Sequence, residues 1–543
     1  MIGVVVHEHD LDVVREFFEL FKTPWERAVP GRQYRAVLVT DGAFSMFNAN
    51  ALLIYGSRGF EIDREVGTVA RRIDGPTELE WKEATLPVYT GVEIFATAHQ
   101  DGVLQRQGEA AAYKFCANGR TVWRIGYDLF DEVRYLLTKG QPPEHALTPT
   151  LELHIELLRH ILIESNVPFV EIPPRPAGCD FICCLTHDVD FFGIRRHWFD
   201  RTMAGFLYRS SVGSLIDLAR GRRSVADLGR NWLACCSLPF VMAGLLPDFW
   251  RPFKDYASVE DQRNSTFFLI PFEGVPGIAP DRTTKSWRAA PYGIADVREE
   301  VTDAVFRGSE IGLHGIDAWR DSDSGKREMR EVAALTGSKT LGSRMHWLYF
   351  DASSPKRLEN AGFDYDSTWG YNDAVGYRAG TSQAFRPIAC NSLIELPMSI
   401  MDSALFSSGR LSLHPEEALD LCRKIIKGAK HFGGTLVVNW HDRSLAPERL
   451  LGRFYQSLLE VVKKGHRVWF AKCGEAVEWF RWRRSIQFRR IQNGPNGHIL
   501  SFQITAPRSH SRGAVVRVHR PAVTVHESMD RMFNGTASIE FET

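Results

Sequence analysis

The stretch Phe181-Ile-Cys-Cys-Leu-Thr-His-Asp-Val-Asp190 places two carboxylates directly after a short apolar run. The run over 181–185 predicts a buried β-strand, because it is apolar and stops at polar residues. In extended backbone, side chains alternate between two faces, so Asp188 and Asp190 lie on the same side of the chain. Taken alone, the motif is most simply an aspartate-rich turn. Further acidic and histidine motifs at other strand ends favour a metal-binding site.

Seven further strand-like runs follow this stretch, and helical patterns separate several of them. The runs cover 266–270, 310–313, 341–345, 363–365, 393–396, 435–438 and 467–470, and the helical patterns cover 295–307, 355–361, 415–430 and 447–464. Alternating strands and helices predict a parallel (β/α) barrel. In such barrels the reactive side chains gather at the carboxyl ends of the strands.

The regions on either side of the barrel have different patterns. Over residues 1–172, β-like runs at 2–6, 36–40 and 51–55 mix with amphipathic runs at 11–21, 128–138 and 148–164, which predicts an α/β domain. We assign no chemistry to this domain. Over 490–543, strand-like runs at 499–504, 513–518, 522–525 and 537–541 predict a small β-rich domain.

Composition limits the classes of partner and compartment. The 66 basic and 66 acidic residues cancel, so no global field favours nucleic acid, and we expect no nucleic-acid partner. The first ten residues lack the pattern of a signal peptide. Nine cysteines without a spaced disulfide pattern fit a reducing, cytoplasmic compartment. Nothing in the sequence indicates an oligomeric state.

A helical insertion is expected at about 195–255, between the first two strands of the barrel. Its eight arginines between 195 and 230 face only Asp200, Asp217 and Asp227, and an apolar run at 232–247 follows. That run is too short and too interrupted to span a bilayer. A basic segment leading into an apolar one is compatible with a peripheral contact at the inner membrane surface through 195–250. The pattern alone favours an alternative, in which the apolar face covers the barrel.

Two histidines follow predicted strands. His314 comes directly after the run at 310–313, and His441 comes after Val437-Val-Asn-Trp440. Imidazole and carboxylate together are ordinary ligands of first-row metals. Histidine is also well suited to donate a proton near neutral pH. Four tryptophans lie near these motifs: Trp319, Trp347, Trp369 and Trp440. Their rings suit stacking on sugars, although aromatic residues at the mouth of a barrel often belong only to its core.

These motifs resemble a known family. Residues 186–190 and 310–315, together with Arg344 and His441, are similar to the successive motifs of the polysaccharide deacetylases, carbohydrate esterases that share the NodB homology domain. The resemblance covers roughly 178–486. More closely, the segments at 185–190, 362–368, 376–381 and 395–397 resemble a bacterial subgroup of long deacetylase-like proteins that carry an N-terminal extension.

The resemblance implies a distorted (β/α) barrel and a metal-dependent removal of acetyl groups, above all N-acetyl groups, from a sugar or glycan. The sequence leaves open whether that glycan is lipid-linked. The resemblance also implies that Asp188 is the general base and that Arg344 orients it. Asp190 and His314 would hold the metal, commonly zinc. His441 would protonate the leaving group, with Asp366 as the candidate that orients it.

The sequence departs from the family pattern at the metal site. Members normally place a second metal histidine four residues after the first, and that position is Ala318 here. A catalytic zinc normally has three protein ligands, so a third is needed. His346 is the first candidate, with Asp317 and His187 behind it, and a core role for His346 is the alternative. The missing ligand also leaves a second functional hypothesis, an inactive barrel that binds glycan.

Overall fold

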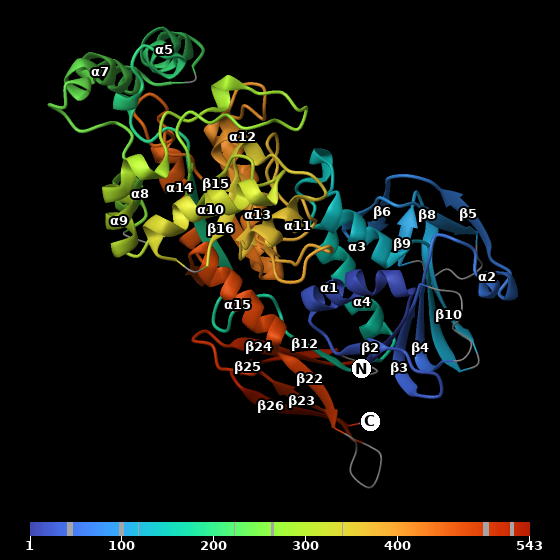
Figure 1. The fold of residues 1–543 in the computed structure, drawn as a ribbon. Coiled ribbons are helices and arrows are strands. Elements are labelled where there is room, and N and C mark those ends of the chain that lie inside the picture. The colour runs from blue at the N-terminus through green and yellow to red at the C-terminus, as the bar shows by residue number, and fades with distance from the viewer. Residues whose placement is uncertain are drawn as a thin grey trace.

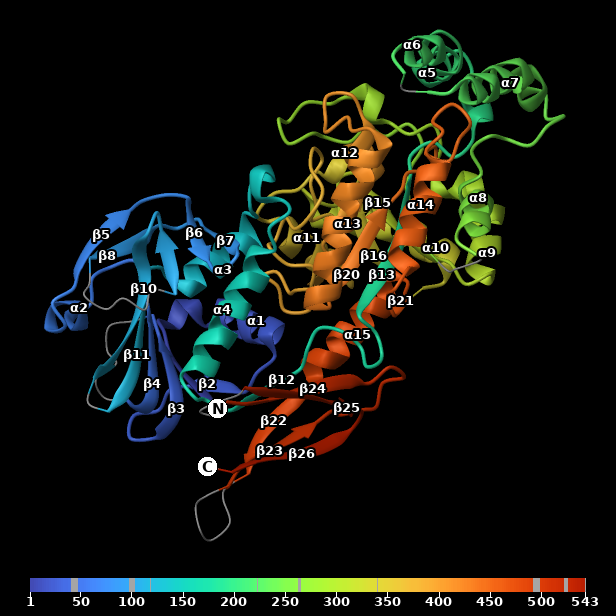
Figure 2. The same ribbon diagram turned by 180° about the vertical axis from the view of Figure 1, so that it is seen from behind.

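The chain forms three adjoining regions, seen from opposite sides in Figures 1 and 2: an N-terminal α/β region, a central barrel and a β-rich C-terminal region. The computed structural model describes all residues except 41–46, 97–102, 118, 222, 262–264, 339, 492–498, 522–525 and 543. The strand expected at 522–525 therefore lies outside the described residues. Among the described helices, none has the length and apolar character needed to cross a membrane.

The central region is built on a nine-stranded sheet in which every pair of neighbours runs parallel. Its order is β18-β17-β16-β15-β14-β13-β20-β19, and β21 also pairs with β13. The strands are β13 (Phe181–Val189), β14 (Thr266–Leu269), β15 (Glu310–Gly315), β16 (Gly342–Met345), β17 (Tyr365–Asp366), β18 (Ile394–Glu395), β19 (Ile400–Met401), β20 (Thr435–Asn439) and β21 (Val468–Phe470). Among the described residues no pairing joins β18 to β19. A sheet of nine parallel strands that is open between β18 and β19 in the described chain confirms the prediction of a distorted parallel barrel.

Helices pack around this sheet. They are α9 (Arg298–Phe306), α10 (Ser322–Thr336), α11 (Ser354–Ala361), α12 (Asp402–Phe406), α13 (Pro415–Phe432), α14 (Gly452–Lys463) and α15 (Cys473–Ser485). Helix α13 shows why the sequence folds in this way. It begins with a proline, ends at Gly433 in left-handed conformation, and buries Ala418, Cys422 and Ile425 at helical spacing. These side chains share one core with the strands.

The N-terminal region has an eleven-stranded mixed sheet with order β2-β1-β3-β4-β11-β10-β9-β6-β7, extended by β8 on β10 and β5 on β8. The strands are β1 (Ile2–Val5), β2 (Trp25–Arg27), β3 (Gln33–Val39), β4 (Asn48–Tyr55), β5 (Val69–Ile73), β6 (Thr77–Trp81), β7 (Ala84–Val88), β8 (Val92–Ala96), β9 (Leu104–Arg106), β10 (Glu109–Ala117) and β11 (Arg120–Ile125). Helices α1 (Leu11–Phe21), α3 (Leu129–Thr138) and α4 (Thr150–Glu164) lie between this sheet and the barrel, and α2 (Glu61–Glu65) lies at its far side (Figure 1). The expected α/β region is therefore present.

Buried polar contacts join the N-terminal region to the barrel. The Arg483 guanidinium, which is buried, donates to the carbonyls of Leu20 and Ile172. The Glu16 carboxylate accepts from the Arg386 amide at 2.8 Å and from the Arg484 guanidinium. Because such groups are costly to bury unpaired, these bonds favour one fixed arrangement of the two regions.

The C-terminal region has two three-stranded antiparallel sheets, with orders β12-β24-β25 and β22-β23-β26. Their strands are β12 (Phe169–Glu171), β22 (Gln487–Ile491), β23 (Ile499–Thr505), β24 (Ala514–Arg520), β25 (Glu527–Phe533) and β26 (Thr536–Glu542). Strand β12 precedes the barrel in sequence, so this region also holds the segment that enters the barrel. The expected β-rich appendage is present. The exact domain boundaries stay a prediction.

A helical protrusion, defined here as residues 194–250, stands between β13 and β14. It contains α5 (Arg201–Tyr208), a π-helical turn (Arg209–Gly213), α6 (Ser214–Ala219) and α7 (Val225–Met242), and α8 (Pro252–Val259) follows it. The Ser224 side chain caps α7 and pairs with Asp227 in a capping box. In Figures 1 and 2, α5 and α7 project beyond the barrel, away from the C-terminal region.

Gly342 allows β16 to pack against its neighbour. A Cβ atom at this position would lie 1.9 Å from a ring carbon of Tyr365, whose hydroxyl donates to Glu310. We therefore expect Gly342→Ala to lower the free energy of unfolding by about 1–3 kcal/mol, because overpacking forces the strand or the ring to move. Thermal unfolding monitored by calorimetry measures this effect. Gly229→Ala, on α7 with no atom within 4 Å of the added Cβ, is the control and should leave the midpoint unchanged or higher.

Candidate metal centre and active site

Strand β13 positions both aspartates of the opening motif. Its apolar residues are buried, as expected for a strand inside a parallel sheet. The Asp188 carboxylate is buried and accepts from Arg344 Nη1 at 3.0 Å and from Asn439 Nδ2 at 2.7 Å. Burial alone would raise the pKa of Asp188, but Arg344 and nearby histidines outweigh it and hold that pKa below its usual value. Asp188 is therefore ionised near neutral pH.

Arg344 is fully buried. Its guanidinium also donates to Thr186 Oγ1 at 2.7 Å, to the Ser367 carbonyl at 3.0 Å and to Ser367 Oγ at 2.9 Å. Its flat face lies over the Phe268 ring, with 4.5 Å to the ring centroid. These contacts fix the plane of the guanidinium, and therefore the orientation of Asp188. The contact expected between Arg344 and Asp188 is present.

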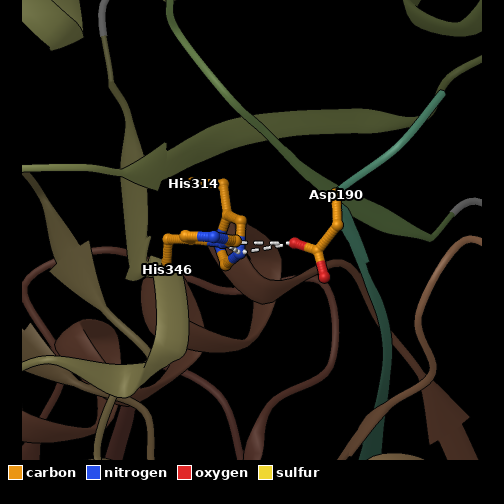
Figure 3. Close-up of side chains that lie close together, drawn as sticks. All are labelled: Asp190, His314 and His346. Carbon is orange, nitrogen blue, oxygen red and sulfur yellow. Dashed lines mark hydrogen bonds and ion pairs between the residues drawn. The ribbon is translucent and has the colours of Figure 1, made fainter. Parts of the chain in front are cut away.

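Asp190, His314 and His346 come together at the strand ends, as Figure 3 shows. Asp190 Oδ1 lies 3.3 Å from His314 Nε2 and 3.2 Å from His346 Nδ1. The two imidazole nitrogens are 3.0 Å apart. The described residues give this carboxylate oxygen no hydrogen bond, although it is buried. Such an oxygen needs a partner, because a buried acceptor without one is costly.

Main-chain carbonyls fix which nitrogen of each ring carries the proton. His314 Nδ1 lies 3.0 Å from the Arg344 carbonyl, and His346 Nε2 lies 3.2 Å from the Arg288 carbonyl. A carbonyl only accepts, so these nitrogens donate, and in neutral rings the facing nitrogens carry lone pairs. Burial lowers the pKa of His346 to about 4, which keeps its ring neutral. Two lone pairs and a carboxylate oxygen that converge on one point fit a bound cation.

The third member of the cluster is His346, the first candidate from the sequence. Strand pairing sets His314 opposite Arg344, so the residues after β16 reach the same strand end. The next two residues, Trp347 and Leu348, both have left-handed backbone, with φ of 65° and 54°. This turn is unfavourable for side chains of that size, and it holds His346 toward Asp190.

The other candidates lie elsewhere. His187 alternates with Asp188 and points to the opposite side of β13, where it stacks on Tyr256 and lies 3.1 Å from Glu260. The Asp317 carboxylate accepts from the Ile278 amide at 3.0 Å. Ala318, at the position of the missing family histidine, is fully buried in the apolar core.

His441 is paired with Asp402, which corrects the assignment of Asp366. His441 Nδ1 lies 2.5 Å from Asp402 Oδ1, and its backbone amide donates to Asp402 Oδ2 at 2.9 Å. Asp366, at the end of β17, instead accepts from Ser343 Oγ at 2.7 Å and from Thr368 Oγ1 at 2.9 Å. Burial alone would lower the pKa of His441, but Asp402 outweighs it and raises that pKa to about 10.

Asp402 and Asn439 are the residues that sequence reasoning missed. Asp402 follows the two-residue strand β19, which is too short to show a periodic pattern. Its one signal is the short apolar run Ile400-Met401 before it, the same signal that marked the other motifs. Asn439 stands in the motif before His441, but an amide has no obvious catalytic role until its contact with Asp188 is seen.

One pocket of about 220 Å³ brings these groups together. Asp188, Asp190, His314, His346 and His441 all line it, and so do residues of its outer wall: Trp347, Phe406, Arg410, Arg443 and Arg449. Of the four tryptophans near the motifs, only Trp347 is exposed, and the other three belong to cores. A larger cavity, of about 860 Å³, lies in the N-terminal region and contains none of the predicted site residues.

Comparisons with known proteins give only weak similarities. A Mycobacterium smegmatis protein described as a polysaccharide deacetylase is 19% identical, with a TM-score of 0.34, over 57% of this chain and 95% of that chain. A Pseudomonas aeruginosa PAO1 protein with the same description is 13% identical, with a TM-score of 0.35, over 59% and 97%. An allantoinase is 14% identical, with a TM-score of 0.34, over 56% and 92%. No protein-family model and no curated protein matches the sequence. At these TM-scores the similarities do not identify a function.

Removal of the His346 imidazole tests the metal centre. We expect His346→Ala to weaken zinc binding by more than roughly 100-fold, because changes at metal-supporting residues alone cost 10- to 100-fold. Metal content after dialysis and competition with a chelator measure the affinity. His431→Ala, an exposed histidine paired with Glu156, is the matched control and should keep full affinity. Unchanged binding in His346→Ala would remove this residue from the metal centre.

Removal of the Asp402 charge should change the titration of His441. The pKa of His441 is raised in the folded chain, so its imidazolium persists as pH rises until about 10. In Asp402→Asn we expect this pKa to fall toward its ordinary value of 6.5, because the largest opposing contribution to burial is lost. NMR titration of the ring measures it. The internal control is His431, whose raised pKa depends on Glu156 and should not move.

Proposed function

We propose that this chain is a metal-dependent hydrolase that removes acetyl groups, above all N-acetyl groups, from a sugar or glycan. The observation that carries the proposal is the convergence of two imidazole lone pairs and the Asp190 carboxylate in the pocket that also holds Asp188 and His441. An ionised carboxylate and a protonated imidazole beside a cation site form the set that amide or ester hydrolysis needs. The family resemblance of the motifs supplies the substrate class.

Two nitrogen ligands and one oxygen ligand suit a divalent first-row metal, with zinc as the leading candidate. Asp190, His314 and His346 would hold it. When bound, the metal would supply Lewis-acid polarisation of the acetyl carbonyl and would lower the pKa of a nearby water molecule. Three protein ligands leave a position open for water or substrate, which is typical of catalytic zinc sites.

Asp188 is proposed as the general base. Arg344 and Asn439 each bond one of its oxygens, so the carboxylate is fixed in orientation and held ionised. Each carboxylate oxygen can accept a further hydrogen bond, and Asp188 lines the pocket. It can therefore take a proton from a water molecule that attacks the acetyl carbon. Arg344 and Asn439 are positioning residues in this scheme.

His441 is proposed as the general acid. Its Nδ1 faces Asp402, so the proton available to the pocket is on Nε2. The raised pKa keeps the imidazolium populated at neutral pH. It can then protonate the departing amine or alcohol as the bond to the acetyl carbon breaks. Trp347 at the pocket wall offers an exposed ring on which a sugar can stack.

Acetate release separates the roles of the two aspartates. In Asp188→Asn we expect acetate release from N-acetylated sugars to fall by about 10²–10⁴, because the base is lost, whereas the metal stays bound, because its ligands keep their own contacts. Circular dichroism checks that the loss of the charge beside buried Arg344 has not unfolded the chain. In Asp190→Ala we expect loss of both metal and release. The control is Asp317→Asn, whose carboxylate bonds the Ile278 amide away from the metal cluster. Glycan binding by the metal-loaded wild-type chain with no acetate release would instead support the inactive, glycan-binding barrel.

A further inference from the structure

The helical protrusion exposes far more large apolar side chains than the rest of the described chain. The described chain has 21 exposed large apolar residues, and twelve of them lie between 198 and 246: Trp198, Phe199, Leu207, Tyr208, Val212, Leu215, Val225, Trp232, Leu233, Phe240, Leu245 and Leu246. Phe199 is 94% exposed and Leu233 is 70% exposed. A concentration of exposed large apolar side chains of this kind is typical of an interaction site in a folded protein.

On α7, the outward face is apolar as well as the inward face. Asn231, Ala234, Leu238 and Val241 are buried, and the last three belong to the small core of the protrusion. Val225, Trp232, Leu233 and Phe240 are exposed at intervals of seven, one and seven residues, which form one helical stripe. A surface helix normally turns polar residues to solvent, and this helix turns apolar ones. Because these side chains are exposed, no part of the described chain covers the stripe.

The segment from α5 to α6 repeats this feature. Leu207, Tyr208, Val212 and Leu215 are exposed along one side, at intervals of one, four and three residues. Phe206 and Met203, on the other side, pack into the small core against α7. The expectation that the apolar face of the insertion covers the barrel is therefore not met for these two stripes.

The excess of arginine over aspartate in the protrusion favours a negatively charged partner. The four aspartates of the protrusion are already engaged. Asp200 lies 2.6 Å from His197, Asp217 lies 3.2 Å from Arg223 and Asp227 lies 3.4 Å from Arg230, while Asp248 accepts from the Ile194 amide at 2.9 Å. Within the described residues, exposed arginines such as Arg196, Arg201 and Arg220 have no carboxylate within ion-pair distance. The surface therefore combines apolar side chains with an excess of positive charge.

The protrusion is fastened to the wall of the candidate active site. Asn231 Nδ2 donates to the Pro447 carbonyl at 2.5 Å, and Arg223 Nη2 donates to the Glu448 carbonyl at 3.4 Å. Both carbonyls belong to the loop that supplies Arg443 and Arg449 to the pocket. The protrusion is therefore joined directly to the loop that lines the pocket.

We propose that the helical protrusion docks on the surface of an anionic lipid bilayer, with its apolar stripes in the interface and its arginines at the lipid headgroups. Tryptophan, tyrosine and leucine on a basic helical surface are typical of helices that lie in the membrane interface. Arginine can extend its charge to phosphate while its stem stays in apolar surroundings. Docking does not depend on the proposed chemistry.

Vesicle flotation of the full chain tests this proposal. We expect the chain to float with phosphatidylcholine vesicles that contain phosphatidylglycerol, to float less with phosphatidylcholine alone, and to lose binding as salt is raised. The double variant Leu233→Glu, Phe240→Glu should bind at least roughly tenfold more weakly, because two large apolar side chains no longer leave water. The matched control is Phe306→Glu on α9, an 88% exposed phenylalanine outside the protrusion. It should float like the wild type.

Several outcomes would overturn the proposal. Absence of flotation by the wild type, or equal flotation of the double variant and the wild type, contradicts it. The apolar stripes could instead join two copies of the chain. In that case the wild type is a dimer and the double variant a monomer in light scattering, and the face is assigned to self-association. Circular dichroism and zinc content, measured on every variant, show that a loss of flotation is not a loss of folding.

Discussion

The structure of the site depends on one buried ion pair, between Arg344 on β16 and Asp188 on β13. Arg344 is fully buried and Asp188 is 2% exposed, at the pocket, so each charge requires compensation inside the barrel. Thr186, Ser367 and Asn439 provide the remaining hydrogen bonds. These bonds hold β13 and β16, which are separated in the sheet by β14 and β15, in one register. Burial without these partners would raise the pKa of the carboxyl group, so it would be protonated at neutral pH and could not accept a proton there.

The alternation of side chains along β13 separates two environments. Asp188 faces the polar interior with Arg344, whereas His187 faces helices on the outside and stacks on Tyr256. A shift of one residue would exchange them, so the pairing of β13 with β14 and β20 decides which side chain enters the pocket. The apolar residues before Thr186 anchor this register by burial in the core.

Much of the barrel was predictable, because all eight expected apolar runs are strands. Strand β19 was not, since two residues carry no periodicity. Asp402 was missed for that reason, and Asp366 was chosen instead because sequence order does not show which carboxylate faces His441. His346 was identified as a candidate, but the orientation of its ring depends on the Arg288 carbonyl, which no side-chain motif encodes. The exposed stripes of the protrusion could not be distinguished from core by their apolar pattern.

Arg344 serves the site twice, through chemically separate groups. Its guanidinium orients Asp188, and its main-chain carbonyl orients the ring of His314. The second task survives any substitution that leaves the strand in place, because every residue type supplies a carbonyl. A substitution of the side chain therefore disturbs Asp188 and leaves the orientation of the His314 ring unchanged. The two halves of the candidate site are joined through a single residue, and yet they respond separately to a change of its side chain.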